Sequence, residues 1–124
     1  MGKNKTIDKE KVALAVIQKI QQEQKPIYIE TMHVDGYATP EKLKAANNDD
    51  MITPDIKVVY ENETNIYEIE LDDPLSTDKW KICMNYARKN HGNFYLVVPD
   101  FLKEQVKEQI KKRKINAGII FFET

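Results

Sequence analysis

Residues that cross-link a chain or make it repetitive are scarce in this sequence of 124 residues. It has one cysteine, Cys83, and two histidines, so an internal disulfide cannot form and a Cys/His zinc site is not expected. Four glycines and five prolines exclude collagen-like and low-complexity chains. A lone cysteine is typical of a reducing compartment, and we expect the protein to be cytoplasmic.

Long apolar runs and an excess of one charge are also lacking. The longest apolar runs, 12–17 and 117–122, are far shorter than the roughly 20 residues that span a bilayer, so no membrane contact is expected. Nineteen Lys and Arg against twenty Asp and Glu give a formal charge of −1. Nucleic-acid binding through bulk positive charge is thereby excluded, whereas a local basic surface is not.

The chain does have a hydrophobic pattern that changes between helical and extended spacing. Helical spacing runs from a predicted N-cap at Thr6 to Gln24 and again after Asp100, which is the expected cap of a last helix. Pro40 at a first helical position predicts a short helical turn over 39–46, outside the sheet. The remaining predicted segments are a helix at 76–91 and strands at 27–35, 56–60, 66–71, 94–98 and 118–122.

The order of these segments, α-β-β-β-α-β-α-β, predicts one α/β domain over residues 1–124. The strands at 56–60 and 66–71 form a hairpin, because the residues between them have turn chemistry. A hairpin that leads into a right-handed β-α-β crossover gives a mixed sheet with helices on both faces. The strand at 94–98 is apolar throughout, as expected for a strand covered on both faces.

Acidic residues gather in and after the predicted hairpin. Glu68 and Glu70 lie on the same face of their strand because side chains alternate, and the hairpin brings Asp55 beside Glu68. Such a group indicates either a solvent-exposed face or a divalent cation site, since Mg²⁺ prefers carboxylates, water and phosphate as ligands. Between 61 and 78 there is no basic residue, and the acids are Glu61, Glu63, Glu68, Glu70, Asp72, Asp73 and Asp78.

Pro54-Asp55 followed by Glu68-Ile69-Glu70, on an α-β-β-β-α-β order over about residues 6–98, resembles the PD-(D/E)XK nuclease superfamily. The resemblance implies the restriction endonuclease-like fold over the single domain 1–124. It also implies hydrolysis of DNA phosphodiester bonds with Mg²⁺ or Mn²⁺, and it makes Asp55 and Glu68 metal ligands. The three carboxylates are expected at one edge of the sheet, within roughly 4 to 7 Å of one another.

The sequence departs from the superfamily at the lysine of the motif, which positions or activates the attacking water. Glu70 stands there, and a few members that carry a second Glu at this place remain active. Glu70 is then a catalytic base or a second metal ligand. Alternatively, the positive charge comes from Lys79 or Lys81 on the following helix, or from Lys57 on the strand of Asp55.

Helix positions add further site residues. Glu10 shares a helical stripe with Leu14 and Ile17, and superfamily members often add a metal-binding acid from the first helix. A first-turn Glu is equally a favourable partner of the helix dipole. The middle helix has four basic residues that are expected to contact the DNA backbone, namely Lys79, Lys81, Arg88 and Lys89.

Two functions follow, a metal-dependent nuclease or a catalytically inactive member of the same fold that acts as a nucleic-acid or protein interaction module. Small members of the superfamily generally act as dimers or beside a partner, so the resemblance implies a homodimer or a partner protein that supplies specificity. In the active case Asp55→Ala is expected to abolish cutting without unfolding the chain, because a surface acid contributes little stability.

Overall fold

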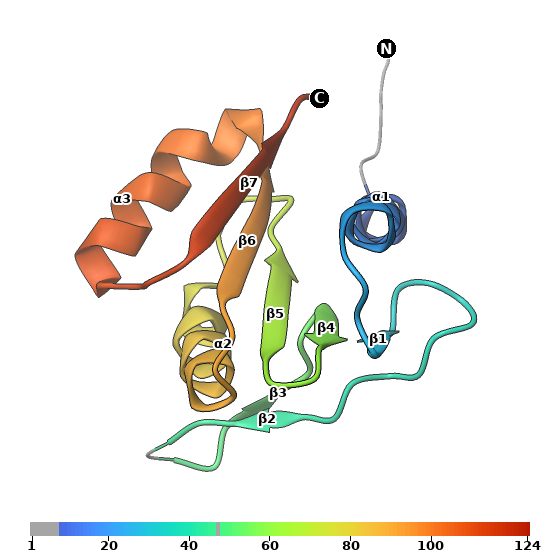
Figure 1. Ribbon diagram of the computed structural model, residues 1–124. Helices are drawn as coiled ribbons and strands as arrows, with labels where there is room; N and C mark the ends of the chain where they lie inside the picture. Colours follow the sequence, from blue (N-terminus) through green and yellow to red (C-terminus); the bar gives the residue numbers. More distant parts are fainter. Residues whose placement is uncertain (1–7, 47) are drawn as a thin grey trace.

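A five-stranded mixed sheet forms the centre of the protein, as a computed structural model that describes residues 8–46 and 48–124 shows (Figure 1). The strand order is β1-β4-β5-β6-β7, and together with its helices the sheet forms a single α/β domain. The strands are β1 (Tyr28–Thr31), β4 (Ile56–Val59), β5 (Thr64–Ile69), β6 (Phe94–Pro99) and β7 (Gly118–Phe122).

The sheet has an antiparallel half and a parallel half. β1, β4 and β5 pair antiparallel, and β4 with β5 is the predicted hairpin. β5, β6 and β7 pair parallel, which requires crossover connections. The helices α2 (Thr77–Lys89) and α3 (Lys103–Arg113) supply them. The predicted mixed sheet is confirmed.

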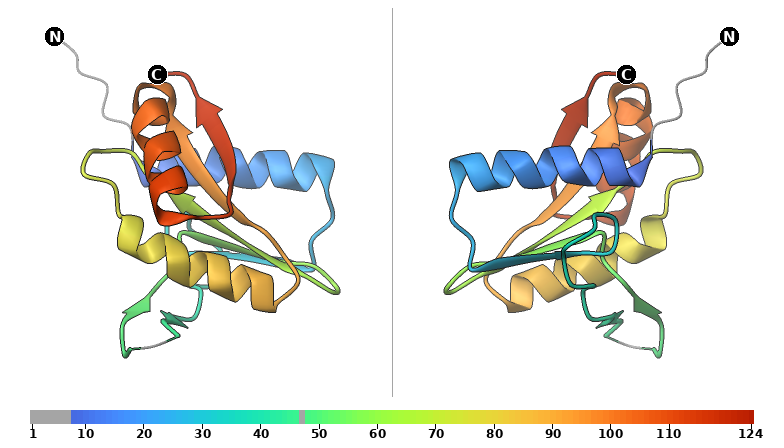
Figure 2. Two further views of the ribbon diagram at one scale, coloured as in Figure 1. Left: turned by 90° about the vertical axis from the view of Figure 1, so that its left-hand side faces the viewer. Right: turned by 90° about the vertical axis from the view of Figure 1, so that its right-hand side faces the viewer.

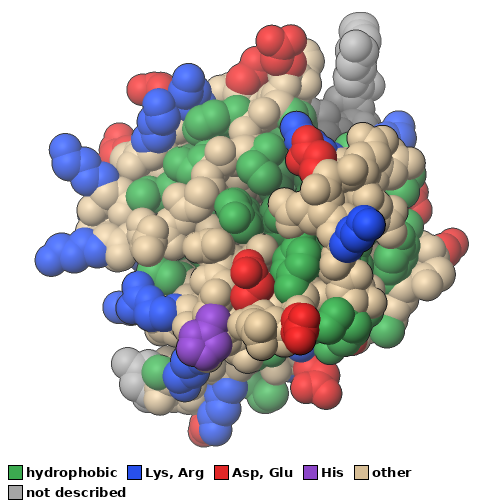
Figure 3. Space-filling view, viewed as in Figure 1, with side chains coloured by type: hydrophobic (Ala, Val, Ile, Leu, Met, Phe, Trp, Pro, Cys, Tyr) green, Lys and Arg blue, Asp and Glu red, His purple; other side chains and the backbone are tan. Residues whose placement is uncertain are grey.

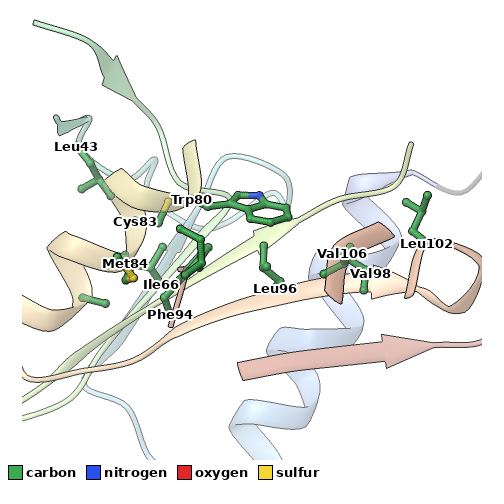
Figure 4. Close-up of a cluster of buried hydrophobic side chains, with 12 residues drawn as sticks. Leu43, Ile66, Trp80, Cys83, Met84, Phe94, Leu96, Val98, Leu102 and Val106 are labelled. Carbon is green, nitrogen blue, oxygen red and sulfur yellow. The ribbon is translucent and has the colours of Figure 1, made fainter. Parts of the chain in front are cut away.

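Helices cover both faces of the sheet. α1 (Lys9–Glu23) lies across one face, and α2 and α3 lie on the other (Figure 2). Two apolar cores result, one between α1 and the sheet and one beneath α2 and α3, where Trp80, Ile66 and Leu96 meet (Figure 4). β5 is buried at every position because both of its faces are covered. None of the described helices has both the length and the apolar character needed to cross a membrane.

The connection from α2 to β6 explains why glycine stands at position 92. His91 adopts a left-handed conformation with φ 62°, which ends the helix. A Cβ on Gly92 would lie 1.9 Å from the carbonyl oxygen of Thr64. Only glycine allows this approach, which seats the end of α2 at the start of β5.

Three local predictions are wrong. The segment predicted as a helical turn over 39–46 instead contains β2 (Leu43–Lys44), which pairs with β3 (Met51–Ile52), because Leu43 is buried in the core with α2. A 3₁₀ turn from Asp100 to Leu102 precedes α3, so Asp100 does not cap that helix. Asp8 caps α1, and its side chain accepts from the Lys11 N–H at 2.9 Å; the predicted cap, Thr6, lies outside the described residues.

Candidate functional site

Asp55 and Glu68 lie opposite each other on adjacent strands. Ile56 pairs with Tyr67 in the register of β4 and β5, which places the preceding residue, Asp55, next to Glu68. The Asp55 N–H donates to Glu68 Oε1 at 3.0 Å, and the Ile69 N–H donates to Asp55 Oδ2 at 2.8 Å. The two acids are 3% and 1% exposed. The hairpin thus brings together two of the three predicted acids, inside the protein rather than on its surface.

Two side chains from distant parts of the chain meet the Asp55 carboxylate. Lys9 Nζ lies 3.1 Å from Asp55 Oδ1 and 3.2 Å from Oδ2, and His33 Nε2 lies 2.7 Å from Oδ1. Lys9 comes from the first turn of α1, which Figure 2 shows beside the end of the sheet where β5 leads toward α2. Neither residue was predicted from the sequence.

The loop that carries His33 is held to the backbone of Asp55 by Thr31. The Thr31 hydroxyl donates to the Asp55 carbonyl at 2.7 Å, and its oxygen accepts from the His33 N–H at 3.2 Å. Thr31 is buried, so these bonds are shielded from water and hold the loop in place. These hydrogen bonds therefore keep His33 next to Asp55.

The surroundings of Glu68 favour its protonated form. Burial and the negative charge of Asp55 raise the pKa of Glu68 to about 8, against the opposing effects of the Asp55 N–H, Lys9 and Lys79. Burial also raises the pKa of the Cys83 thiol on α2, and the neighbouring Glu68 raises it further. At neutral pH Glu68 is therefore mainly the neutral carboxylic acid.

Glu70 makes a different set of contacts. Glu70 Oε2 accepts from the indole N–H of Trp80 at 2.9 Å, and Oε1 accepts from the Ser76 N–H at 2.9 Å. The Trp80 side chain is fully buried, so its N–H needs an acceptor. Within the described part of the chain, no hydrogen bond or ion pair joins Glu70 to Asp55 or Glu68. Glu70 thus anchors the start of α2 to the end of β5.

Removal of the indole N–H is expected to destabilise the protein. Trp80→Phe leaves a buried oxygen of Glu70 without its donor, and we expect the free energy of unfolding to fall by about 1 to 3 kcal/mol. Urea denaturation of Trp80→Phe, Glu70→Gln and the double variant measures the coupling between the two side chains. Strictly additive effects would contradict the anchoring role of Glu70.

The predicted lysines reach the acids only in part. Lys79 is half-buried and lies near enough to Glu68 to favour its charged form. Lys81 is exposed and lines a cleft of about 290 Å³ between the β2–β3 hairpin and α2. Lys57 pairs with Glu30, at 3.8 Å between Nζ and Oε1. Lys9, rather than Lys81 or Lys57, is the basic side chain in contact with the acids.

Glu10 does not join the site. Its side chain is exposed, and the preceding residue, Lys9, turns toward the sheet instead. The predicted stripe is wrong because Val12 and Ala13 face the core, whereas Leu14 is 41% exposed. The residue of α1 that reaches the acids is therefore Lys9, a positive counter-charge, and not Glu10, the predicted metal ligand.

Arg88 and Lys89 lie at the other end of α2 from the acids. The carbonyl of Asn90, the residue after them, accepts from the N–H of Thr64 at the start of β5, whereas Glu68 is near the end of that strand. Both side chains are exposed. The four predicted DNA-contacting residues therefore do not surround the acids. Basic side chains also project from the outer side of α3 (Figure 3).

The carboxylate oxygens of Asp55 and Glu68 are ligands of the kind that a hard divalent cation prefers. Mg²⁺ is commonly held by one or two carboxylates, with water and phosphate completing its shell. In the described ranges no group of three or more His, Cys, Asp or Glu is arranged to hold a metal, which agrees with the separate role of Glu70. Binding through both acids requires Lys9 to leave Asp55 and Glu68 to lose its proton.

Comparisons with known proteins find no match to this chain among family models, curated proteins or solved structures. The resemblance to the PD-(D/E)XK superfamily, carried by Pro54-Asp55 and Glu68-Ile69-Glu70, stays a prediction.

Proposed function

We propose that this chain is a metal-dependent nuclease that hydrolyses DNA phosphodiester bonds at Asp55 and Glu68. The observation that supports this is the burial of two acids side by side on adjacent strands, with 3% and 1% of their surfaces exposed. Placing two carboxyl groups together out of water is costly for stability. Perturbed acids of this kind are enriched at functional sites.

The proposal includes the restriction endonuclease-like fold and a cytoplasmic location. The element order and the mixed sheet agree with that fold, and the unpaired Cys83 agrees with a reducing compartment. A domain of this size leaves little surface beyond the core for choosing a target. A second copy of the chain or a specificity partner therefore belongs to the proposal.

Each residue of the site has a role in the proposed reaction. Asp55 and Glu68 would hold Mg²⁺ or Mn²⁺, which supplies an activated water and neutralises charge on the phosphate. The Ile69 N–H and the loop of Thr31 and His33 keep the Asp55 carboxylate in place. Lys9 supplies the positive charge that the motif lacks at position 70.

A second candidate is a catalytically inactive domain that binds nucleic acid or a protein partner. The contacts of Glu70 favour it, because Trp80 and Ser76 already occupy both of its oxygens and leave no base at that position. The contact of Lys9 with Asp55 also favours it, since that carboxylate is already compensated by a lysine. In this case Asp55 and Glu68 are structural.

A cleavage assay with matched variants separates the two functions. We expect the wild-type protein to cut DNA with Mg²⁺ or Mn²⁺, and Asp55→Asn to lose at least about 100-fold of that activity, because a neutral amide is a poor ligand for a hard cation. Asp72→Asn, an exposed acid of the same segment, should cut like the wild type.

The same proteins are melted with and without metal. Wild-type protein that neither cuts DNA nor gains thermal stability with Mg²⁺ or Mn²⁺ would reject the nuclease and favour the interaction module. Equal cutting by wild type and Asp55→Asn would place the active site elsewhere.

A further inference from the structure

The ammonium of Lys9 lies evenly between the two oxygens of Asp55. The Nζ–Oδ distances are 3.1 and 3.2 Å, so the charge sits where a cation bound by both oxygens would sit. A divalent cation and Lys9 cannot occupy this position together, because their charges repel at short range. The contact is therefore competitive with metal binding through both oxygens.

We propose that Lys9 is a tethered counter-cation that a divalent metal must displace, so that Lys9 sets the metal concentration at which the site fills. This inference rests on the proposed function, since it concerns metal binding at Asp55. It adds a determinant of metal affinity, contributed by α1.

The burial of Asp55 explains why a counter-cation is needed when metal is absent. The Asp55 side chain is 4% exposed, and a carboxylate removed from water requires a positive partner or several donors. Lys9 is fixed to the first turn of α1, so its ammonium is present at a high effective concentration. A metal ion from solution competes against this concentration, which weakens its apparent affinity.

Lys9 is also able to leave. Its side chain is 37% exposed, so the long aliphatic stem can carry the ammonium into water at little cost. The Ile69 N–H donates to Asp55 from the backbone of β5, so the carboxylate stays oriented after Lys9 has left. The displaced ammonium remains tethered beside the site, where it can pair with a phosphate oxygen of the substrate.

A Mn²⁺ titration of charge-altered variants tests this proposal without using activity. Wild type, Lys9→Met, Lys9→Arg and Lys11→Met are titrated by calorimetry and by thermal melting. We expect Lys9→Met to lower the Mn²⁺ midpoint by about tenfold, because the tethered competitor is gone. Lys9→Arg keeps the charge and should not lower the midpoint. Lys11→Met removes an exposed charge from the same helix and should stay within about twofold of the wild type.

The other possible results distinguish a failure of the displacement from a failure of the proposed nuclease. A midpoint for Lys9→Met equal to or above that of a metal-binding wild type overturns the displacement and leaves the proposed nuclease intact. No binding by any of the proteins overturns both. If Lys9→Met is unfolded without metal, refolding in saturating Mn²⁺ supports the proposal, because the metal then replaces the ammonium. Failure to refold there overturns it.

Discussion

Glu68→Gln is expected to remove a large part of the pH dependence of stability. Burial raises the pKa of Glu68 from its ordinary value of 4.5 to about 8 in the folded protein. Between these values the folded state holds a proton that the unfolded state has lost, so wild-type stability falls as the pH rises. The fall is at most about 1.4 kcal/mol per pH unit. Below the lower pKa Glu68 adds no pH dependence, and above the upper pKa the loss of stability is complete.

Glutamine imitates the protonated acid and does not titrate. We therefore expect Glu68→Gln to gain stability over the wild type as the pH rises from about 5 to about 8. Urea denaturation across this range measures the difference, with Glu61→Gln in the exposed turn as the matched control. Parallel pH profiles for wild type and Glu68→Gln would show that Glu68 is not held protonated.

Asp55→Ala is expected to destabilise the folded protein, contrary to the prediction for a surface acid. The Asp55 carboxylate is buried and accepts from the Ile69 N–H and from Lys9, with His33 beside it. Its removal leaves a buried N–H without a partner, and we expect the free energy of unfolding to fall by about 3 kcal/mol. Lys9 contributes little to this loss because it can turn to solvent.

Chemical denaturation of Asp55→Ala against Asp72→Ala measures this effect. Asp72 is exposed, so its substitution should change stability by at most about 0.5 kcal/mol. Equal stabilities of the two variants would show that the contacts of Asp55 contribute nothing. The expected instability is also the reason that Asp55→Asn, which keeps an acceptor for the Ile69 N–H, is the better variant for activity assays.

The hairpin and its pair of acids could be predicted because the information is local. Alternation over 56–60 and 66–71, with turn residues between them, sets the register that places Asp55 beside Glu68. The parallel pairing of β5 with β6 followed from a helix between two strands. Short-range patterns of this kind indicate both whether a segment is a helix or a strand and on which face a side chain lies.

The partners of Asp55 could not be predicted because they come from distant segments. Lys9 is 46 residues away from Asp55 and His33 is 22 residues away, so no local spacing connects them. The exposure of Glu10 depends on which residues of α1 face the core. Tertiary packing decides how α1 is rotated about its own axis. The spacing of the apolar residues agrees with a rotation that buries Leu14 and with one that exposes it.

The contacts of Glu70 differ from the role that its place in the motif indicates. Its place in the motif indicates chemistry, whereas the side chain that it contacts, Trp80, lies on the following helix. A buried indole N–H needs an acceptor, and Glu70 at the end of the preceding strand supplies it. That need was a signal in the sequence for a structural role of the acid.

A crystal structure of the protein with Mn²⁺ tests whether Asp55 and Glu68 form a metal site. Anomalous diffraction locates Mn²⁺ independently of any assumption about its ligands. We expect a Mn²⁺ ion bound by the carboxylates of Asp55 and Glu68, with Lys9 moved away from Asp55 and Glu70 still bonded to Trp80. Lys9 still in contact with Asp55, with no Mn²⁺ at the two acids under saturating metal, would contradict it.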